Sequence, residues 1–290
     1  MLLPTGVAVA IAAVFGLLIG SFLNVVIHRL PKMMEAEWAA NCAELAGQAP
    51  AEAAPFNLVR PRSRCPHCGH VIRWYENIPV LSYLMLRGKC SNCGAAIGIR
   101  YPIVELVTSA LLAWIAARHG LTIVAAVWAA FACILLAQFL IDFDTQLLPD
   151  DLNYPLLWLG LIAAATGWTQ VPLKSAVWGA VFGYLSLWTI YQAHKALTGK
   201  EGMGHGDFKL LAALGAWFGA EYLVAIVLLS SVVGAVLGIV LIIVGRIANR
   251  DIPIPFGPFL AGAGLLALVV GPAELAQLIP FAFPFARAIH

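Results

Sequence analysis

Long apolar stretches separated by short polar ones dominate the chain. Residues 5–27 contain no charged side chain over 23 positions, and a membrane-spanning helix needs about 20 mostly apolar residues. The same criterion predicts seven further spans. They are residues 103–118, 121–141, 152–171, 175–194, 207–220, 221–245 and 257–279. Only residues 31–102 form a polar segment long enough to be a separate domain.

Composition agrees with this pattern. Hydrophobic residues make up 61% of the 290 residues, charged residues make up 11%, and the mean hydropathy is +0.88. Soluble domains have about 45–50% apolar and about 25% charged residues, so a soluble enzyme, a disordered chain and a disulfide-framework toxin are excluded. A net charge of +2 gives no indication of nucleic-acid binding. We therefore expect an all-α polytopic membrane protein with about eight transmembrane helices.

The distribution of lysine and arginine predicts the orientation in the membrane. No basic residue precedes the first apolar run, so we expect it to be an uncleaved helix and not a signal peptide. With eight spans, 14 of the 17 basic residues fall on the side that carries residues 31–102. Basic residues are enriched in cytoplasmic loops. The polar segment is thus expected in the cytoplasm, with both termini in the periplasm.

Four of the six cysteines form two CxxC pairs within the polar segment. They are Cys65 with Cys68 and Cys90 with Cys93, with Gly69 and Gly94 directly after them. This spacing is typical of a four-cysteine zinc ribbon, and a reducing cytoplasm favours metal thiolates over disulfides. The alternative is a set of unmetallated or redox-active thiols. Nearby histidines and single cysteines are expected to be bystanders or packing residues, namely His67, His70, Cys42 and Cys133.

Carboxylates gather at two predicted membrane edges. Asp142, Asp144, Asp150 and Asp151 follow one span, and Asp207 begins another, both on the predicted cytoplasmic side. Carboxyl groups flanked by apolar residues are partly desolvated, and two such groups can share one proton, as in aspartic proteases. The simpler alternative is that Asp150, Asp151 and Asp207 cap helices. Gly204 and Gly206 would let a backbone approach Asp207 closely.

Several motifs together resemble the bifunctional type IV prepilin peptidases, which are leader peptidases and N-methyltransferases of type IV pilus and type II secretion systems. The resemblance runs nearly end to end. It is carried by Gly20–Pro31, the two cysteine pairs, Asn77–Pro79, Ser82–Leu84, Arg100–Pro102, Asp142–Asp150, Gly204–Lys209 and Pro253–Pro258.

This resemblance implies an inner-membrane aspartic protease of the Gly-x-Gly-Asp class. Such an enzyme removes the short basic leader of prepilins and pseudopilins after a glycine at the cytoplasmic face. It then methylates the new amino terminus, usually a phenylalanine, with S-adenosylmethionine. The catalytic pair carried over is Asp142 and Asp207. The supporting residues are Gly204, Gly206, Lys209, Asp144 and Asp150.

The predicted domains follow from both arguments. Residues 1–30 form the first transmembrane helix, residues 31–102 a cytoplasmic four-cysteine zinc domain, and residues 103–290 a seven-helix protease domain in the lipid bilayer. The resemblance assigns the zinc domain to the bifunctional members. The contacts of S-adenosylmethionine and the oligomeric state are not predicted.

Four polar residues are left with two interpretations each. Asn24 and His28 share one helix face and either act together in methylation or make structural hydrogen bonds. Glu105, early in the second span, is either a functional carboxylate or a packing residue. Lys209 either tunes Asp207 or extends its amine toward lipid headgroups.

Three other functions compete with the bifunctional enzyme. A peptidase without methyltransferase activity is the nearest, and the presence of the cysteine domain argues against it. A non-enzymatic membrane assembly factor would use the zinc domain to bind a partner and would not need Asp142 or Asp207. A transporter would need ionisable residues near helix centres, and the predicted spans have almost none.

Overall fold

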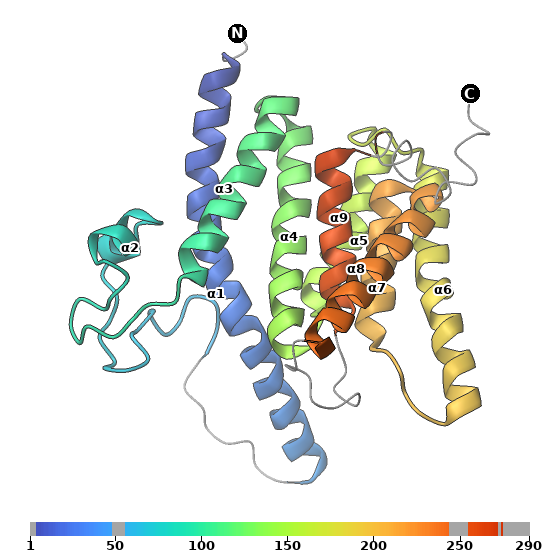
Figure 1. The fold of residues 1–290 in the computed structure, drawn as a ribbon, viewed down its shortest axis with the longest axis horizontal. Helices are drawn as coiled ribbons and strands as arrows, with labels where there is room; N and C mark the ends of the chain where they lie inside the picture. Colours follow the sequence, from blue (N-terminus) through green and yellow to red (C-terminus); the bar gives the residue numbers. More distant parts are fainter. Residues whose placement is uncertain (1–3, 48–55, 244–254, 272–273, 275–290) are drawn as a thin grey trace. The chain divides into compact units, whose positions relative to one another are not determined.

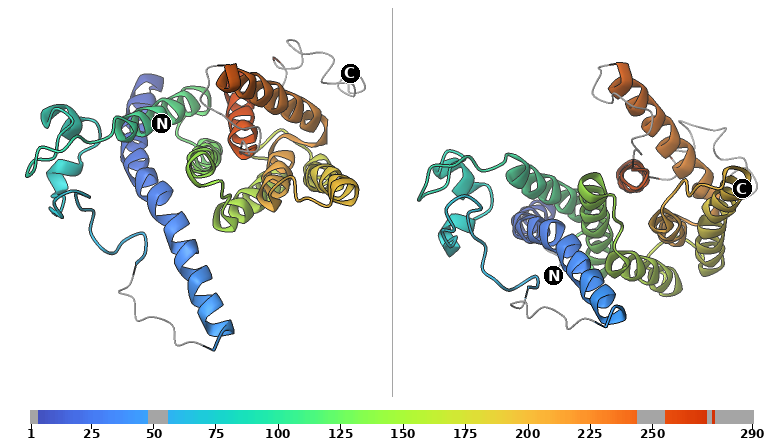
Figure 2. Two further views of the ribbon diagram at one scale, coloured as in Figure 1. Left: turned by 60° about the horizontal axis from the view of Figure 1, so that its bottom comes forward. Right: turned by 90° about the horizontal axis from the view of Figure 1, so that it is seen from below.

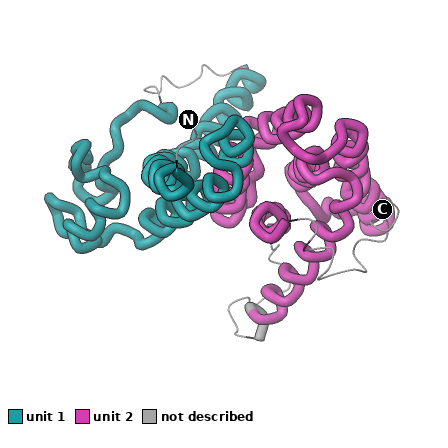
Figure 3. Tube along the Cα trace, turned by 90° about the horizontal axis from the view of Figure 1, so that it is seen from above, with its two compact units in different colours: residues 1–129 teal, residues 130–290 magenta. Residues whose placement is uncertain are grey.

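The computed structural model describes residues 4–47, 56–243, 255–271 and 274 (Figure 1). Within these residues the chain is helical, with two isolated β-bridges and no named strand. It divides into two compact units, residues 1–129 and 130–290 (Figure 3). The all-α class predicted from the hydropathy pattern is therefore confirmed.

Two long helices form the framework of unit 1. They are α1 (Thr5–Leu45) and α3 (Arg100–His119), which pack along one another. Small residues allow this close approach, because a Cβ atom on Gly20 would lie only 2.6 Å from the Cα atom of Glu105. The Ser109 hydroxyl adds a hydrogen bond of 2.8 Å to the Ala13 carbonyl.

Helix α1 continues without a break through Pro31 and runs past the end of α3 (Figure 2). The alanine- and glutamate-rich stretch after Pro31 is thus the exposed end of the same helix. Between residues 56 and 99 the described polar segment contains two short helices, η1 (Trp74–Asn77) and α2 (Leu81–Met85).

The polar segment is tied to the long helices by hydrogen bonds. Arg29, a buried residue of α1, donates to the carbonyls of Asn57 and Pro61 at 2.9 and 2.7 Å. Such bonds satisfy a guanidinium that would otherwise be buried at a high cost. Glu105 of α3 accepts a hydrogen bond of 2.8 Å from the backbone N–H of Val80.

Unit 2 is arranged around one short central helix, α7 (His205–Phe218). Its neighbours are α5 (Asp150–Ala165), α6 (Leu173–Thr198) and α9 (Gly257–Val270). A 3₁₀ turn, η2 (Ala220–Tyr222), leads into α8 (Leu223–Ile243), and α4 (Ile123–Thr145) crosses the boundary between the units. From Asp207 to Phe218 only Lys209 of α7 is not buried.

Two contacts explain how α7 packs so tightly. The backbones of α6 and α7 meet at Gly179 and Gly215, where a Cβ atom on either glycine would collide with the backbone of the other helix. The indole N–H of Trp217 donates a hydrogen bond of 2.8 Å to the carbonyl of Leu156 in α5. Both contacts hold the C-terminal half of α7, and Asp207 lies at the other end of the same helix.

The prediction of eight spans is only partly supported. Each predicted segment coincides with a helix, but four helices of the described chain are long and apolar enough to cross a membrane: α1, α3, α4 and Ala220–Val240. Helices α5, α7 and α9 have 16, 14 and 14 residues, fewer than a full crossing needs. The last part of the predicted span 257–279 lies outside the described residues.

The contact between Gly179 and Gly215 predicts the effect of a minimal substitution. We expect Gly215→Ala to lower the thermal unfolding midpoint in detergent, because an inserted methyl group in a packed contact costs about 1–3 kcal/mol. Gly262→Ala is the matched control, since its Cβ would meet Phe139 at an ordinary 3.6 Å. Equal unfolding midpoints for the two variants would contradict this account.

Candidate functional site

Two acidic side chains are buried in unit 2. Asp142 lies near the end of α4 and is 4% exposed, and Asp207 lies in the first turn of α7 and is 7% exposed. Gly257 faces the Asp142 carboxyl group and the Leu148 side chain, and Leu148 also meets Gly206, the residue before Asp207. The structure therefore brings together the two aspartates that the sequence predicted as a pair.

Both carboxyl groups have an oxygen atom with no hydrogen-bond partner in the described chain, Oδ2 of Asp142 and Oδ1 of Asp207. Buried polar atoms in folded proteins almost always have a partner. An unpartnered carboxylate oxygen is costly to bury, and such groups concentrate at functional sites. This pair is therefore a candidate catalytic centre.

The start of α7 places Asp207. Gly204 is the N-cap residue in an extended conformation, and the N–H of Asp207 bonds to the Gly204 carbonyl at 3.3 Å. The helix N-terminus favours a negative charge at this position. Neither Asp207 nor Asp150 is an N-cap residue, since α5 is capped by Pro149. The capping alternative for these two aspartates is therefore wrong.

A single leucine fills the space beside both aspartates. A Cβ atom on Gly206 would lie 2.6 Å from Cβ of Leu148, and one on Gly257 would lie 2.9 Å from Cδ1 of the same side chain. Gly257 also faces the carboxyl group of Asp142. The space beside Gly206 is taken by the Leu148 side chain and not by a backbone, so the predicted approach of a backbone to Asp207 stays a prediction. Gly204 has more room, with Oδ2 of Asp207 at 3.9 Å from its Cβ position.

Lys209 does not pair with Asp207. Its amine lies 2.7 Å from both carboxylate oxygens of Asp150 and 5.2 Å from the centre of the Tyr154 ring. Neither alternative from the sequence, tuning of Asp207 or extension toward lipid, describes this contact. Lys209 and Asp150 instead join the N-terminal turns of α7 and α5. Asp144 is exposed at the end of α4.

Gln138 and Asn153, which the sequence analysis missed, support the segment between α4 and α5 that carries Leu148. The amide of Gln138, fully buried one turn before Asp142, donates a hydrogen bond of 2.8 Å to the Asn153 side chain. Asn153 in turn donates to the carbonyl of Leu148 at 3.4 Å. A glutamine within the apolar span 121–141 was a usable signal, because polar side chains in such helices usually have a partner.

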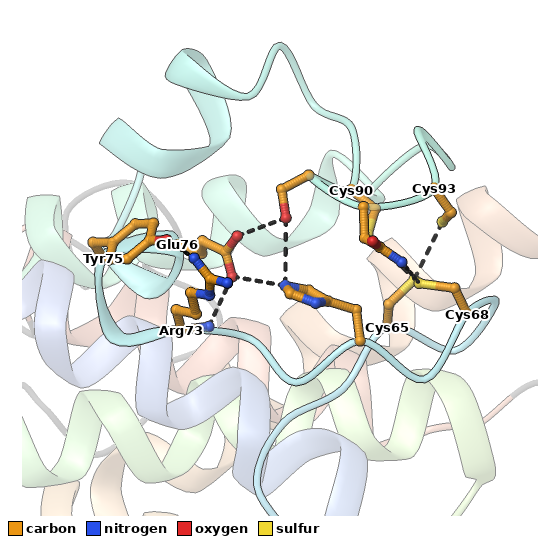
Figure 4. A network of polar contacts seen from close by, with 10 residues as sticks. Cys65, Cys68, Arg73, Tyr75, Glu76, Cys90 and Cys93 are labelled. Atoms are coloured by element: carbon orange, nitrogen blue, oxygen red, sulfur yellow. Dashed lines mark hydrogen bonds and ion pairs between the residues drawn. The ribbon is translucent and has the colours of Figure 1, made fainter.

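The four cysteines form a second site, in unit 1 (Figure 4). All four Sγ atoms lie within 4.8 Å of one another, and the pairs Cys65–Cys93 and Cys68–Cys90 are 3.9 Å apart. Four sulfurs held tetrahedrally at about 2.3 Å from a zinc ion are about 3.8 Å apart, whereas disulfide sulfurs are about 2.05 Å apart. The donor set and its spacing therefore fit a metal.

Each cysteine pair has the expected tight turn. The N–H of Cys65 bonds to the carbonyl of His70, and that of Cys90 bonds to the carbonyl of Ala95, at 2.9 and 2.8 Å. Gly69 and Gly94 have φ angles of +70° and +72°, a region that glycine adopts without strain. These glycines therefore let the backbone turn tightly after each cysteine pair.

His70 is not part of the cysteine group, and its side chain contacts other residues. Its Nε2 atom is 3.1 Å from Oε2 of Glu76, which also accepts a hydrogen bond of 2.8 Å from the N–H of Arg73. Ser91 donates to Oε1 of Glu76 at 2.6 Å. These hydrogen bonds, that of Arg73 foremost, lower the pKa of Glu76 to about 2. Figure 4 shows this network beside the cysteines.

Asn24, His28 and Glu105 each make a contact of the structural kind that the sequence analysis considered. Asn24 donates to the carbonyl of Tyr101 at 3.1 Å. His28 lies 3.0 Å from the amine of Lys32. Glu105 is the buried acceptor of the Val80 N–H. The Asn24 contact joins α1 to α3, the Glu105 contact joins α3 to the polar segment, and the His28 contact lies within α1.

Two family models match the chain. Residues 14–119 match the model of the bacterial peptidase A24 N-terminal domain, and residues 129–239 match that of the type IV leader peptidase family. No solved structure matches the chain.

Several curated relatives are called prepilin leader peptidase/N-methyltransferase. Those of Pseudomonas aeruginosa and Stutzerimonas stutzeri are 55% and 54% identical over 268 and 273 residues, which cover 92% and 93% of both chains. That of Aeromonas hydrophila is 52% identical over 264 residues, 89% of both chains. With both units matched and this identity sustained over nearly its whole length, the chain belongs to the type IV leader peptidase family.

Proposed function

We propose that this protein cleaves the leader from prepilins and pseudopilins and then methylates the new amino terminus. The observation that carries the peptidase activity is the buried pair of Asp142 and Asp207 with unpartnered oxygen atoms. The relatives' name, prepilin leader peptidase/N-methyltransferase, supports both activities.

The proposed mechanism uses the pair as one acid and one base. Two neighbouring carboxyl groups in an apolar site hold one proton between them, since ionising both is unfavourable. The ionised group takes a proton from a water molecule, whose oxygen attacks the carbonyl carbon of the scissile bond. The protonated group stabilises the developing oxyanion by a hydrogen bond. Proton transfer to the amide nitrogen then releases the leader.

The residues around Asp142 and Asp207 suggest how the two carboxyl groups are held in position. Leu148 limits access of water on the side of Gly206 and Gly257. The Lys209 amine forms its ion pair with Asp150 and not with Asp207. In the proposal, Gly204, Gly206, Lys209 and Asp150 are positioning residues, and Asp144 is exposed to solvent.

The metal of the cysteine group is proposed to be zinc. Cys65, Cys68, Cys90 and Cys93 would hold it as four thiolates, and a closed four-sulfur site is structural. The described part of the polar segment has few buried apolar residues, so bound metal would contribute much of its folding free energy. S-Adenosylmethionine is the proposed methyl donor and supplies an electrophilic methyl group when bound.

The proposed location is the bacterial inner membrane. The excess of basic residues near the polar segment favours a cytoplasmic cysteine domain and active site, with periplasmic termini and eight crossings. A prepilin could then keep its basic leader in the cytoplasm while its apolar helix enters from the bilayer.

The dyad is tested by intact-mass analysis of a prepilin with a glycine–phenylalanine junction. We expect Asp142→Asn and Asp207→Asn each to reduce leader removal by at least 10³-fold, because an amide cannot act as the acid or base. Asp151→Asn, which changes an exposed aspartate of α5, is the matched control and should cleave normally. An active, correctly inserted Asp207→Asn enzyme would falsify the assignment. Loss of activity in all three variants would also contradict it.

The metal assignment is tested by elemental analysis of the purified protein. We expect one zinc ion per chain, and Cys68→Ser should lower this stoichiometry and make the polar segment sensitive to limited proteolysis. Cys42→Ser, which changes an exposed cysteine of α1, should do neither. Full zinc content in Cys68→Ser would contradict a four-thiolate site.

A further inference from the structure

A pocket of about 370 Å³ adjoins the cysteine group in unit 1 and has no part in the proposed peptide cleavage. Its lining includes Arg73, Tyr75, Glu76, Met85, Leu86 and Asn92. The volume lies within the range of small-molecule sites, about 300–1,000 Å³. One wall comes from the turn between Cys90 and Cys93, where the Asn92 amide lies 3.6 Å from Sγ of Cys68.

The pocket offers one fixed negative charge. The side chain of Glu76 is only 8% exposed and is held by Arg73, His70 and Ser91. A carboxylate offers about four acceptor positions, so three hydrogen bonds leave one for a ligand. With a pKa of about 2, the Glu76 side chain is ionised at neutral pH.

The pocket also offers a positive charge with unused donors. Arg73 donates one side-chain hydrogen bond in the described chain, of 2.6 Å to the hydroxyl of Tyr75. A guanidinium has five N–H donors and suits a carboxylate well. Its carbon lies 5.9 Å from the centre of the Tyr75 ring, which restrains the direction in which it points (Figure 4).

An apolar surface completes the lining. Tyr75 and Met85 are 44% and 83% exposed, so both side chains are accessible to a ligand in the pocket. Leu86 lies beside Met85 along the chain. A flat heteroaromatic ring can pack on the tyrosine ring and on the polarizable thioether.

We propose that this pocket binds S-adenosylmethionine, with Arg73 on its α-carboxylate, Glu76 on its α-ammonium group, and Tyr75, Met85 and Leu86 around its adenine. The α-carboxylate, the α-ammonium group and the adenine of the ligand match the three features of the pocket, and its sulfonium carries a second positive charge. This inference rests on the proposed methyltransferase activity. In that reaction the amine nitrogen attacks the methyl carbon, the carbon–sulfur electrons return to sulfur, and the nitrogen releases one proton.

Binding is measured by calorimetry on the full-length enzyme in detergent, with S-adenosylmethionine and its demethylated product S-adenosylhomocysteine. We expect Arg73→Ala to raise the Kd for both at least tenfold, and Ser82→Trp, which fills the pocket, to abolish binding. Arg62→Ala is the matched control, an exposed arginine of the same segment outside the pocket. Leader cleavage and zinc content serve as checks that each variant is folded and should remain unchanged.

The outcomes separate this inference from the function on which it rests. If the wild type binds the ligand and methylates while Arg73→Ala and Ser82→Trp do so equally well, the pocket assignment is wrong and the proposed function stands. If the wild type cleaves prepilin but neither binds the ligand nor adds a methyl group, the methyltransferase proposal fails first. Selective loss of binding and methylation in the two pocket variants supports the assignment.

Discussion

Two carboxyl groups buried side by side in an apolar helical unit set the main physical constraint on unit 2. Each loses favourable hydration without gaining a full set of hydrogen bonds, which opposes folding. The surrounding contacts offset this loss. Helix α7 is fixed by the glycine contact with α6 and by the hydrogen bond from Trp217 to Leu156. Leu148 then packs against Gly206 and Gly257, so the aspartates cannot relax toward water.

The contact between Lys209 and Asp150 keeps the lysine from neutralising the charge of Asp207. A lysine two residues after Asp207 would be expected to pair with it, since both lie at the start of one helix. The lysine instead binds Asp150 of α5. Within the described residues neither Asp142 nor Asp207 then forms an ion pair, which favours a shared proton.

Unit 1 meets a different constraint. Its polar segment has few buried apolar side chains in the described residues, so packing alone cannot hold it. Hydrogen bonds to Arg29 and Glu105 attach it to α1 and α3, and the cysteine group closes its two turns. The pocket with Glu76 and Arg73 depends on this arrangement, because Ser91 and Asn92 belong to one of those turns.

The sequence by itself determined the helical class, the four-cysteine group and the two acidic motifs, because each depends on composition or local spacing. Helix ends were less predictable: α1 continues through Pro31 to Leu45, since proline in a helix removes a hydrogen bond without always ending it. Only the tertiary structure decided that Lys209 binds Asp150, that Leu148 separates Gly206 from Gly257, and that Gln138 and Asn153 support Leu148. Those contacts join residues from different helices, and the local sequence does not determine which helix faces meet.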